Sequence, residues 1–302
     1  MPKSKGRLNQ TKKFFEMNIS ASRIIHERIE ICTTKNVEKI KEMITEVKLT
    51  DDSKQLLDIS KKLSRLLKSN YLIAMTDDKS TLIHTLKDYK EKELSTKYIS
   101  TMNTITSLYS YLEAFMRNMM LKYYEDDVRR LTESNKTIQY SELVTLVLGD
   151  ELILRKIAEE IVEKDIRGSI EVWVKKLHKM GFDKFILSDT TRELTLVRHA
   201  IVHNSSRGSK ELADKFPKFY EQWKRINISN EKLEDFFSST HKTVTWLQKE
   251  YGRLYKVPYT SYDQINYGID SSSIESVDMS DKLTMDMNIP VEKTPLKKGV
   301  SE

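Results

Sequence analysis

Four polar side chains that can do chemistry lie between Arg198 and Asn204, in the segment R-H-A-I-V-H-N. They supply a guanidinium, two imidazoles and an amide, and the apolar residues around them have helical spacing. His199 and His203 are four residues apart, so a helix places both imidazoles on one face. Arg198 and His203 are five apart, about 140° around the axis and about 7.5 Å along it. Long side chains can still converge on one ligand from there.

Three interpretations of this segment are open. In the first it is a polar helix end, where Arg198 pairs with an acid and the histidines fill an interface. In the second, H-x-x-x-H binds a metal ion. Two features disfavour it: the residues between the two histidines are apolar, and Glu193 lies on a helix face from which it is poorly placed to be a third ligand. In the third, the site acts on a phosphodiester without metal. An imidazole can move a proton to or from a ribose oxygen near neutral pH, while a guanidinium holds the phosphate.

The elements that position this segment are predicted to be helices. The 302 residues include only 8 glycines and 5 prolines, and no proline occurs between Pro2 and Pro217. Strand-rich proteins need frequent turn residues, so this scarcity indicates an all-α fold. The apolar spacing predicts helices at 22–48, from Asp51 to Leu67, and at 81–94, 96–131, 140–148, 151–162, 170–180, 189–204, 211–226 and 230–255. Asp189 is expected to cap the helix with the polar segment.

Composition divides the chain into three predicted regions. Residues 1–94 form an N-terminal helical region with a basic lead-in over 1–20, and residues 95–257 form the main helical bundle. Residues 258–302 are rich in Ser, Asp, Met and Thr and carry more acids than bases. Such a segment buries too little apolar surface to offset ordering, so we expect a flexible acidic tail.

Charge and cysteine content indicate the compartment and the class of partner. The net charge of +6 is compatible with nucleic acid without requiring it. The single cysteine, Cys32, excludes an intramolecular disulfide and fits a reducing compartment. Because no signal peptide or membrane-length apolar run is recognisable, the sequence predicts a cytoplasmic protein without membrane contact.

Two segments together resemble the HEPN superfamily. Arg198 and His203 match its R-x(4–6)-H signature, and T-R-E-L-T-L-V-R-H-A-I-V-H-N is similar to its second core helix. Upstream, S-L-Y-S-Y-L-E-A-F-M-R-N-M-M (107–120) is similar to its first core helix, with Glu113 at the usual acidic position. The resemblance covers about residues 95–255 and implies an up-and-down bundle of the RiboL-PSP-HEPN type that dimerises.

The resemblance also implies a function: metal-independent RNA cleavage by a homodimer, leaving a 2′,3′-cyclic phosphate, as in toxins and antiviral-defence effectors. His203 would be the general acid/base and Arg198 the phosphate-binding residue, with no metal or cofactor. His199 and Asn204 would position RNA or the catalytic histidine.

Other roles have simple alternatives. Glu113 would orient Arg198 or His203, or else pair with Arg117. Arg207 and Lys210 would contact RNA phosphates, or else belong to a solvated loop. A protein antitoxin, sensor or activator is a further expected partner. The alternative function is a non-catalytic module that binds RNA or a protein through the same helix.

Overall fold

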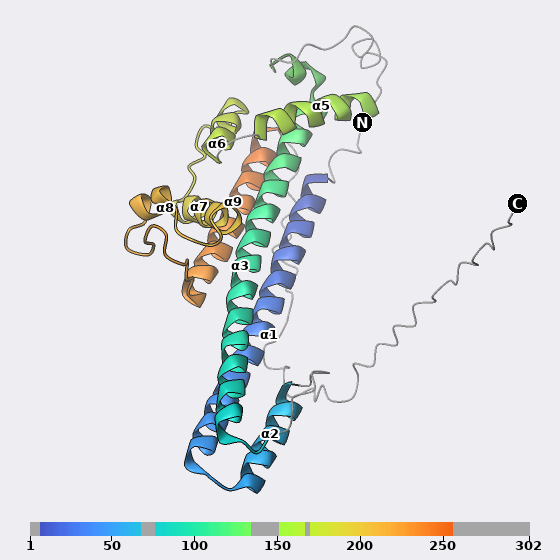
Figure 1. The fold of residues 1–302 in the computed structure, drawn as a ribbon. Coiled ribbons are helices and arrows are strands. Elements are labelled where there is room, and N and C mark those ends of the chain that lie inside the picture. Colours follow the sequence, from blue (N-terminus) through green and yellow to red (C-terminus); the bar gives the residue numbers. More distant parts are fainter. Residues whose placement is uncertain (1–6, 68–75, 134–150, 167–169, 256–302) are drawn as a thin grey trace, which may run out of the picture. The chain divides into compact units, whose positions relative to one another are not determined.

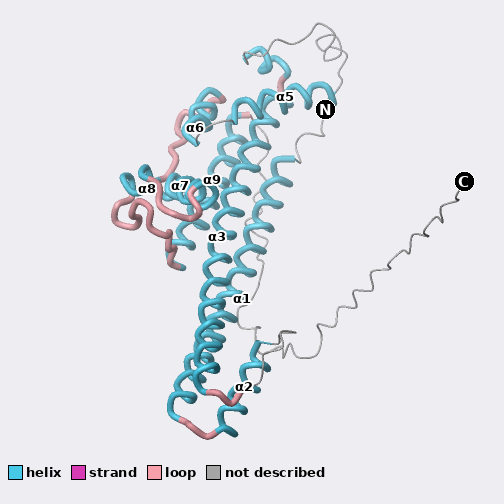
Figure 2. The backbone as a smooth tube through the Cα atoms, viewed as in Figure 1, coloured by secondary structure: helices cyan, strands magenta, loops and turns pink. Residues whose placement is uncertain are grey.

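The computed structural model describes residues 7–67, 76–133, 151–166 and 170–255, and every helix of this part belongs to one compact unit, Met1–Tyr259. The protein is all-α: the described residues form a helical bundle without strands (Figures 1 and 2). The predicted helix at 140–148 and the predicted tail at 258–302 lie outside the described residues.

Two long helices form the scaffold. Helix α1 (Arg7–Leu49) packs side by side with α3 (Lys79–Asp126), as Figure 1 shows. Helix α2 (Ser53–Leu67) packs against both, and its Leu63 shares a core with Ile40 of α1 and Leu86 of α3; all three side chains are fully buried.

The remaining helices pack around the second half of α3. They are α5 (Glu151–Ile166), α6 (Ile170–Lys179), α7 (Asp189–His203), α8 (Lys210–Lys215) and α9 (Asn230–Leu254), while a 3₁₀ helix, Val128–Glu133, follows α3. One core lies between α3, α5, α6 and α9, with Phe115 and Trp173 at its centre. A second core lies between α3, α7 and α9, and it is this core that holds the polar segment in place.

Four predicted helices differ from the observed ones. Helix α1 begins at Arg7 rather than in the twenties, because Phe15 is buried and packs on Phe115, with ring centroids 6.0 Å apart. The two helices predicted at 81–94 and 96–131 are one continuous helix, α3. The predicted boundary between two regions of the chain, at residues 94 and 95, falls inside this helix. No glycine or proline interrupts it.

The helix predicted at 211–226 is wrong beyond its first turn. Helix α8 ends at Lys215 because Pro217 follows, and a residue before proline is pushed out of the helical region. Phe216 accordingly has φ −130° and ψ 55°. The chain then runs without helix to Ser229, which caps α9 by accepting a hydrogen bond from the backbone of Lys232.

Candidate active site on helix α7

Hydroxyl groups define the start of α7. Ser188, not Asp189, is the N-cap: its side chain accepts a hydrogen bond from the backbone N–H of Thr191 at 3.2 Å. Ser239 of α9 lies 2.7 Å from the Ser188 hydroxyl and 2.8 Å from that of Thr191. These contacts fix the first turn of α7 to α9 as well as satisfying its free backbone donors.

Two residues with a left-handed backbone conformation follow the C-terminal end of α7. The Ala200 carbonyl accepts hydrogen bonds from the backbone N–H groups of Asn204 (3.0 Å) and Ser206 (3.1 Å). Ser205 and Ser206 have φ of 51° and 60°, a backbone conformation that turns the chain sharply off the helix axis. His203 is therefore the last helical residue, and its side chain stands beside a tight turn.

One face of α7 is completely buried. Leu194, Val197 and Ala200 are fully inaccessible and belong to one core with Ile105 and Leu108 of α3. The spacing of these three residues, every third position, is that of a helix stripe facing a core. This packing determines which way the polar side chains of the same helix point.

The two histidines share the exposed face, as their spacing predicts. The His199 and His203 side chains are exposed, and their ring centroids are 4.6 Å apart with an interplanar angle of 42°. Val202 beside them is 48% exposed. The last turn of α7 thus presents two imidazoles and an isopropyl group to solvent.

Arg198 has a different environment. Its guanidinium carbon lies 5.1 Å from the centroid of the Tyr109 ring on α3, and its Nε is buried without a hydrogen-bond partner among the described residues. The pKa of the Tyr109 phenol is raised to about 12, first by burial and then by the charge of Glu113, while the Arg198 cation opposes the rise. The ring therefore stays neutral and offers Arg198 a π face.

Arg198 and His203 have different surroundings within one chain. No hydrogen bond joins them in the part of the chain that the structure describes: Arg198 contacts α3, whereas His203 faces solvent. The predicted separation around the helix axis accounts for this division.

The supporting residues of the prediction lie around this helix. Glu113 is half-buried on α3, one turn after Tyr109, and acts on the Tyr109 phenol through its charge. The alternative pair with Arg117 is not formed, because Arg117 donates to Glu163 of α5 at 2.9 Å. No ion pair joins Glu113 to Arg198 or His203 in the described residues.

Asn204, Arg207 and Lys210 follow α7. Asn204 is the C-cap residue. Arg207 is exposed and donates from Nη1 to the Trp223 carbonyl at 3.1 Å, and the exposed Lys210 begins α8. Neither cation has an acidic partner within 4.0 Å among the described residues, so both are free to meet an anion.

Sequence reasoning missed two groups near the site. Tyr109, which holds Arg198, reads in the sequence as an ordinary core aromatic; its place one turn before Glu113 was the available signal. Glu193 is 2% exposed, accepts a hydrogen bond from the Tyr220 hydroxyl at 2.7 Å and pairs with Lys232 at 2.6 Å. The Glu193 carboxylate therefore joins α7 to Tyr220 in the loop before α9 and to Lys232 in α9, and we assign it a structural role.

Two features are absent from the described residues. These residues contain no group of three or more His, Cys, Asp or Glu side chains arranged to hold a metal ion. None of their helices has the length and apolar character needed to cross a membrane. Among known proteins, no family model, no curated protein and no solved structure matches this chain.

Proposed function

We propose that the protein is a metal-independent endoribonuclease of the HEPN type that works as a homodimer, in the manner of toxins and antiviral-defence effectors. The observation that carries this proposal is the end of α7, where two exposed imidazoles and a half-buried guanidinium lie within two turns of one helix. The chain offers a proton donor and acceptor and a fixed cation, the two things that cleavage of an RNA phosphodiester needs.

The histidines carry the proton transfers. Cleavage requires a base at the ribose 2′-hydroxyl and an acid at the departing 5′-oxygen, with phosphorus between them. The His199 and His203 rings lie 4.6 Å apart on one face of the helix, tilted by 42°, and cannot flank one phosphate from opposite sides. We assign His203 as the general acid/base of one chain, with the motif of a second copy acting from the other side. The products are a 2′,3′-cyclic phosphate and a 5′-hydroxyl.

Arg198 binds the phosphate. The Tyr109 face holds the guanidinium carbon, so the terminal amino groups can reach an anion without searching many rotamers. Arg207 and Lys210, on the turn just after the helix, extend the positive surface along which an RNA strand can lie. A protein antitoxin, sensor or activator would act by covering or exposing this surface.

The test uses purified protein and total RNA or tRNA in EDTA. Wild type should cleave RNA and leave 2′,3′-cyclic phosphate ends. His203→Ala should lower the rate about 10²–10⁴-fold, the range for loss of a general acid/base. Arg198→Ala should also cut the rate by about 10²-fold or more, as for loss of a transition-state charge donor.

Matched controls separate chemistry from folding. His241→Ala removes an exposed histidine from α9, and Arg192→Ala removes an exposed arginine from the first turn of α7; both should cleave like wild type. If wild type leaves RNA intact yet binds it through Arg198, the non-catalytic module replaces the nuclease. Equal cleavage by wild type and His203→Ala would remove His203 from the mechanism.

A further inference from the structure

A cavity lies between α3 and the chain that leads into α9, and none of its lining residues belongs to the α7 motif. Its volume is about 480 Å³, within the range of small-molecule sites. Tyr98 and Met102 of α3 form one wall, and Arg225, Ile226 and Asn227 form the other. The cavity therefore has an apolar interior with a cation and an amide from a loop.

Arg225 covers the cavity's aromatic ring. Its guanidinium carbon is 3.6 Å from the centroid of Tyr98, and the residue as a whole is exposed. No carboxylate pairs with Arg225 within the described residues. A guanidinium that is stacked and unpaired keeps its planar donors available for the two oxygens of a phosphate.

The Tyr98 hydroxyl is an unused donor. Its oxygen is buried and has no hydrogen-bond partner in the described structure. A buried hydroxyl without a partner destabilises the folded state, and a ligand oxygen that accepts from it would remove this cost.

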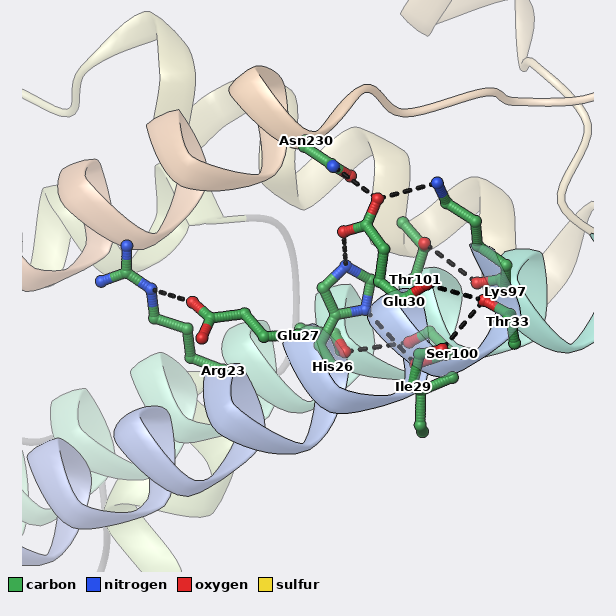
Figure 3. A network of polar contacts seen from close by, with 11 residues as sticks. Arg23, His26, Glu27, Ile29, Glu30, Thr33, Lys97, Ser100, Thr101 and Asn230 are labelled. Atoms are coloured by element: carbon green, nitrogen blue, oxygen red, sulfur yellow. Dashed lines mark hydrogen bonds and ion pairs between the residues drawn. The ribbon is translucent and has the colours of Figure 1, made fainter. Parts of the chain in front are cut away.

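Lys97 is the other cation that lines the cavity, and a hydrogen-bond network holds it in place. Figure 3 shows the Lys97 ammonium on Glu30 of α1, at 2.7 Å, while Asn230 of α9 donates to the same carboxylate at 2.6 Å. The two hydrogen bonds to Glu30 join α1, α3 and α9. Since Glu30 neutralises Lys97, the free charge of the cavity comes from Arg225.

We propose that this cavity binds a phosphate monoester carried on a small planar apolar group. Arg225 takes the phosphate, the Tyr98 hydroxyl donates to one of its oxygens, and Met102 and Ile226 enclose the planar group. The site is separate from the proposed RNA cleavage and does not depend on it, because its residues are not those of the α7 motif.

The experiment is isothermal titration calorimetry of the full chain with phenyl phosphate, in EDTA and without RNA. Wild type should bind phenyl phosphate saturably, and inorganic phosphate at least about tenfold more weakly, because the apolar contact is missing. Arg225→Gln should weaken phenyl phosphate binding at least about tenfold through loss of a charge-assisted hydrogen bond. Arg192→Gln, an equally exposed arginine on α7, should leave binding unchanged.

Tyr98→Phe tests the site in a way that a folding defect cannot imitate. Removing an unpaired buried hydroxyl should leave the ligand-free protein as stable in urea as wild type, or more stable. The same variant should bind phenyl phosphate more weakly. Absence of saturable binding, equal binding by Arg225→Gln, or equal binding of inorganic phosphate would each overturn the proposal. None of these results bears on RNA cleavage, which the His203→Ala assay decides separately.

Discussion

At the scale of single residues, the position of the Arg198 guanidinium depends on one aromatic ring. Its Nε is buried without a hydrogen bond, so the contact with Tyr109 is what compensates for taking the cation partly out of water. A cation–π contact contributes about 0.5–2 kcal/mol, more when it is desolvated. Tyr109 is thus a positioning residue in the proposed reaction, acting through Arg198 rather than on RNA.

Replacing Tyr109 tests this role. Tyr109→Leu removes the π face, and we expect kcat for RNA cleavage to fall about tenfold, the equivalent of about 1.4 kcal/mol. Tyr109→Phe keeps the ring and should keep kcat near that of wild type. Steady-state kinetics on a short RNA measure both. A loss in the Phe variant equal to that in the Leu variant would show that the hydroxyl, not the ring face, matters.

A second residue with a measurable consequence is His26, in the network of Figure 3. Its ring is 4% exposed, and Nδ1 lies 3.3 Å from the Ser100 hydroxyl. Burial lowers the pKa of His26 below 6.5; Glu30, Glu27 and Glu234 oppose this shift, while Lys97 adds to it. The folded protein therefore keeps His26 neutral at a pH where the unfolded chain already binds a proton.

The sign of the pH dependence follows from this difference. Below about pH 6.5 the unfolded state binds more protons at this position, so the free energy of unfolding falls as the pH falls. His26→Gln should flatten that dependence between about pH 7 and pH 5, measured by urea denaturation at several pH values. His84→Gln, which removes an exposed histidine of α3, is the control and should keep the wild-type slope. Identical slopes for wild type and His26→Gln would contradict the assignment.

At the scale of elements, the turn after α7 is joined by hydrogen bonds to the segment 224–226. Arg225 and Ile226 of this segment line the cavity beside Tyr98. Ile226 donates from its backbone to the Ser206 carbonyl at 2.9 Å, and Gly208 donates to that of Lys224 at 2.9 Å. A side chain at position 208 has no room, because a Cβ there would lie 2.3 Å from the Glu221 carbonyl oxygen. The close approach of these two backbones therefore requires glycine.

Gly208→Ala should break this junction. Because the obstacle is backbone, the chain must shift, and we expect the free energy of unfolding to fall by about 1–3 kcal/mol. Ser205→Gly is the paired variant: φ is 51° there, so glycine relieves a left-handed serine and should leave stability equal or slightly higher. Urea denaturation of both variants gives the comparison. Equal stability of Gly208→Ala and wild type would show that the two segments separate freely.

The same elements show what the sequence could reveal. Helix α7 was predicted within one residue at its C-terminal end, because its apolar stripe and the polar stretch after it are local signals. The continuity of α3 was not predicted, since its first half has few apolar residues and is held by α1 and α2. The helix predicted at 211–226 is wrong because Pro217 excludes the residue before it from the helical conformation, so α8 ends at Lys215.

The candidate site was likewise predictable only in its local features. The shared face of His199 and His203 follows from helix geometry and was predicted from spacing alone. The contact of Arg198 with Tyr109 joins residues 89 positions apart and depends on how α7 packs on α3, which periodicity does not encode. The Arg225–Tyr98 pair escaped prediction for the same reason, because it depends on where a loop crosses a helix.

At the scale of the whole molecule, the proposed reaction needs a second copy of the chain. One chain places His203 in solvent and Arg198 against α3, and in the proposed reaction another α7 opposite the first supplies the second set of groups. The proposed contact would use the exposed face of α7, where Val202 is 48% exposed beside the two histidines. If the two-fold axis of the proposed dimer passes through this face, Val202 lies close to its own copy.

Val202→Glu should therefore separate the two chains. A carboxylate at this position places two like charges together across the axis and removes the apolar contact, so the variant should sediment as a monomer and cleave RNA at least about tenfold more slowly. Ile186→Glu is the matched control: Ile186 is 83% exposed in the loop before α7 and should tolerate a charge without change. Sedimentation velocity and the RNA assay, run on the same samples, link assembly to activity. A monomeric wild type that cleaves as fast as its variant would show that one α7 is sufficient, and the acid and base would then have to be sought within a single chain.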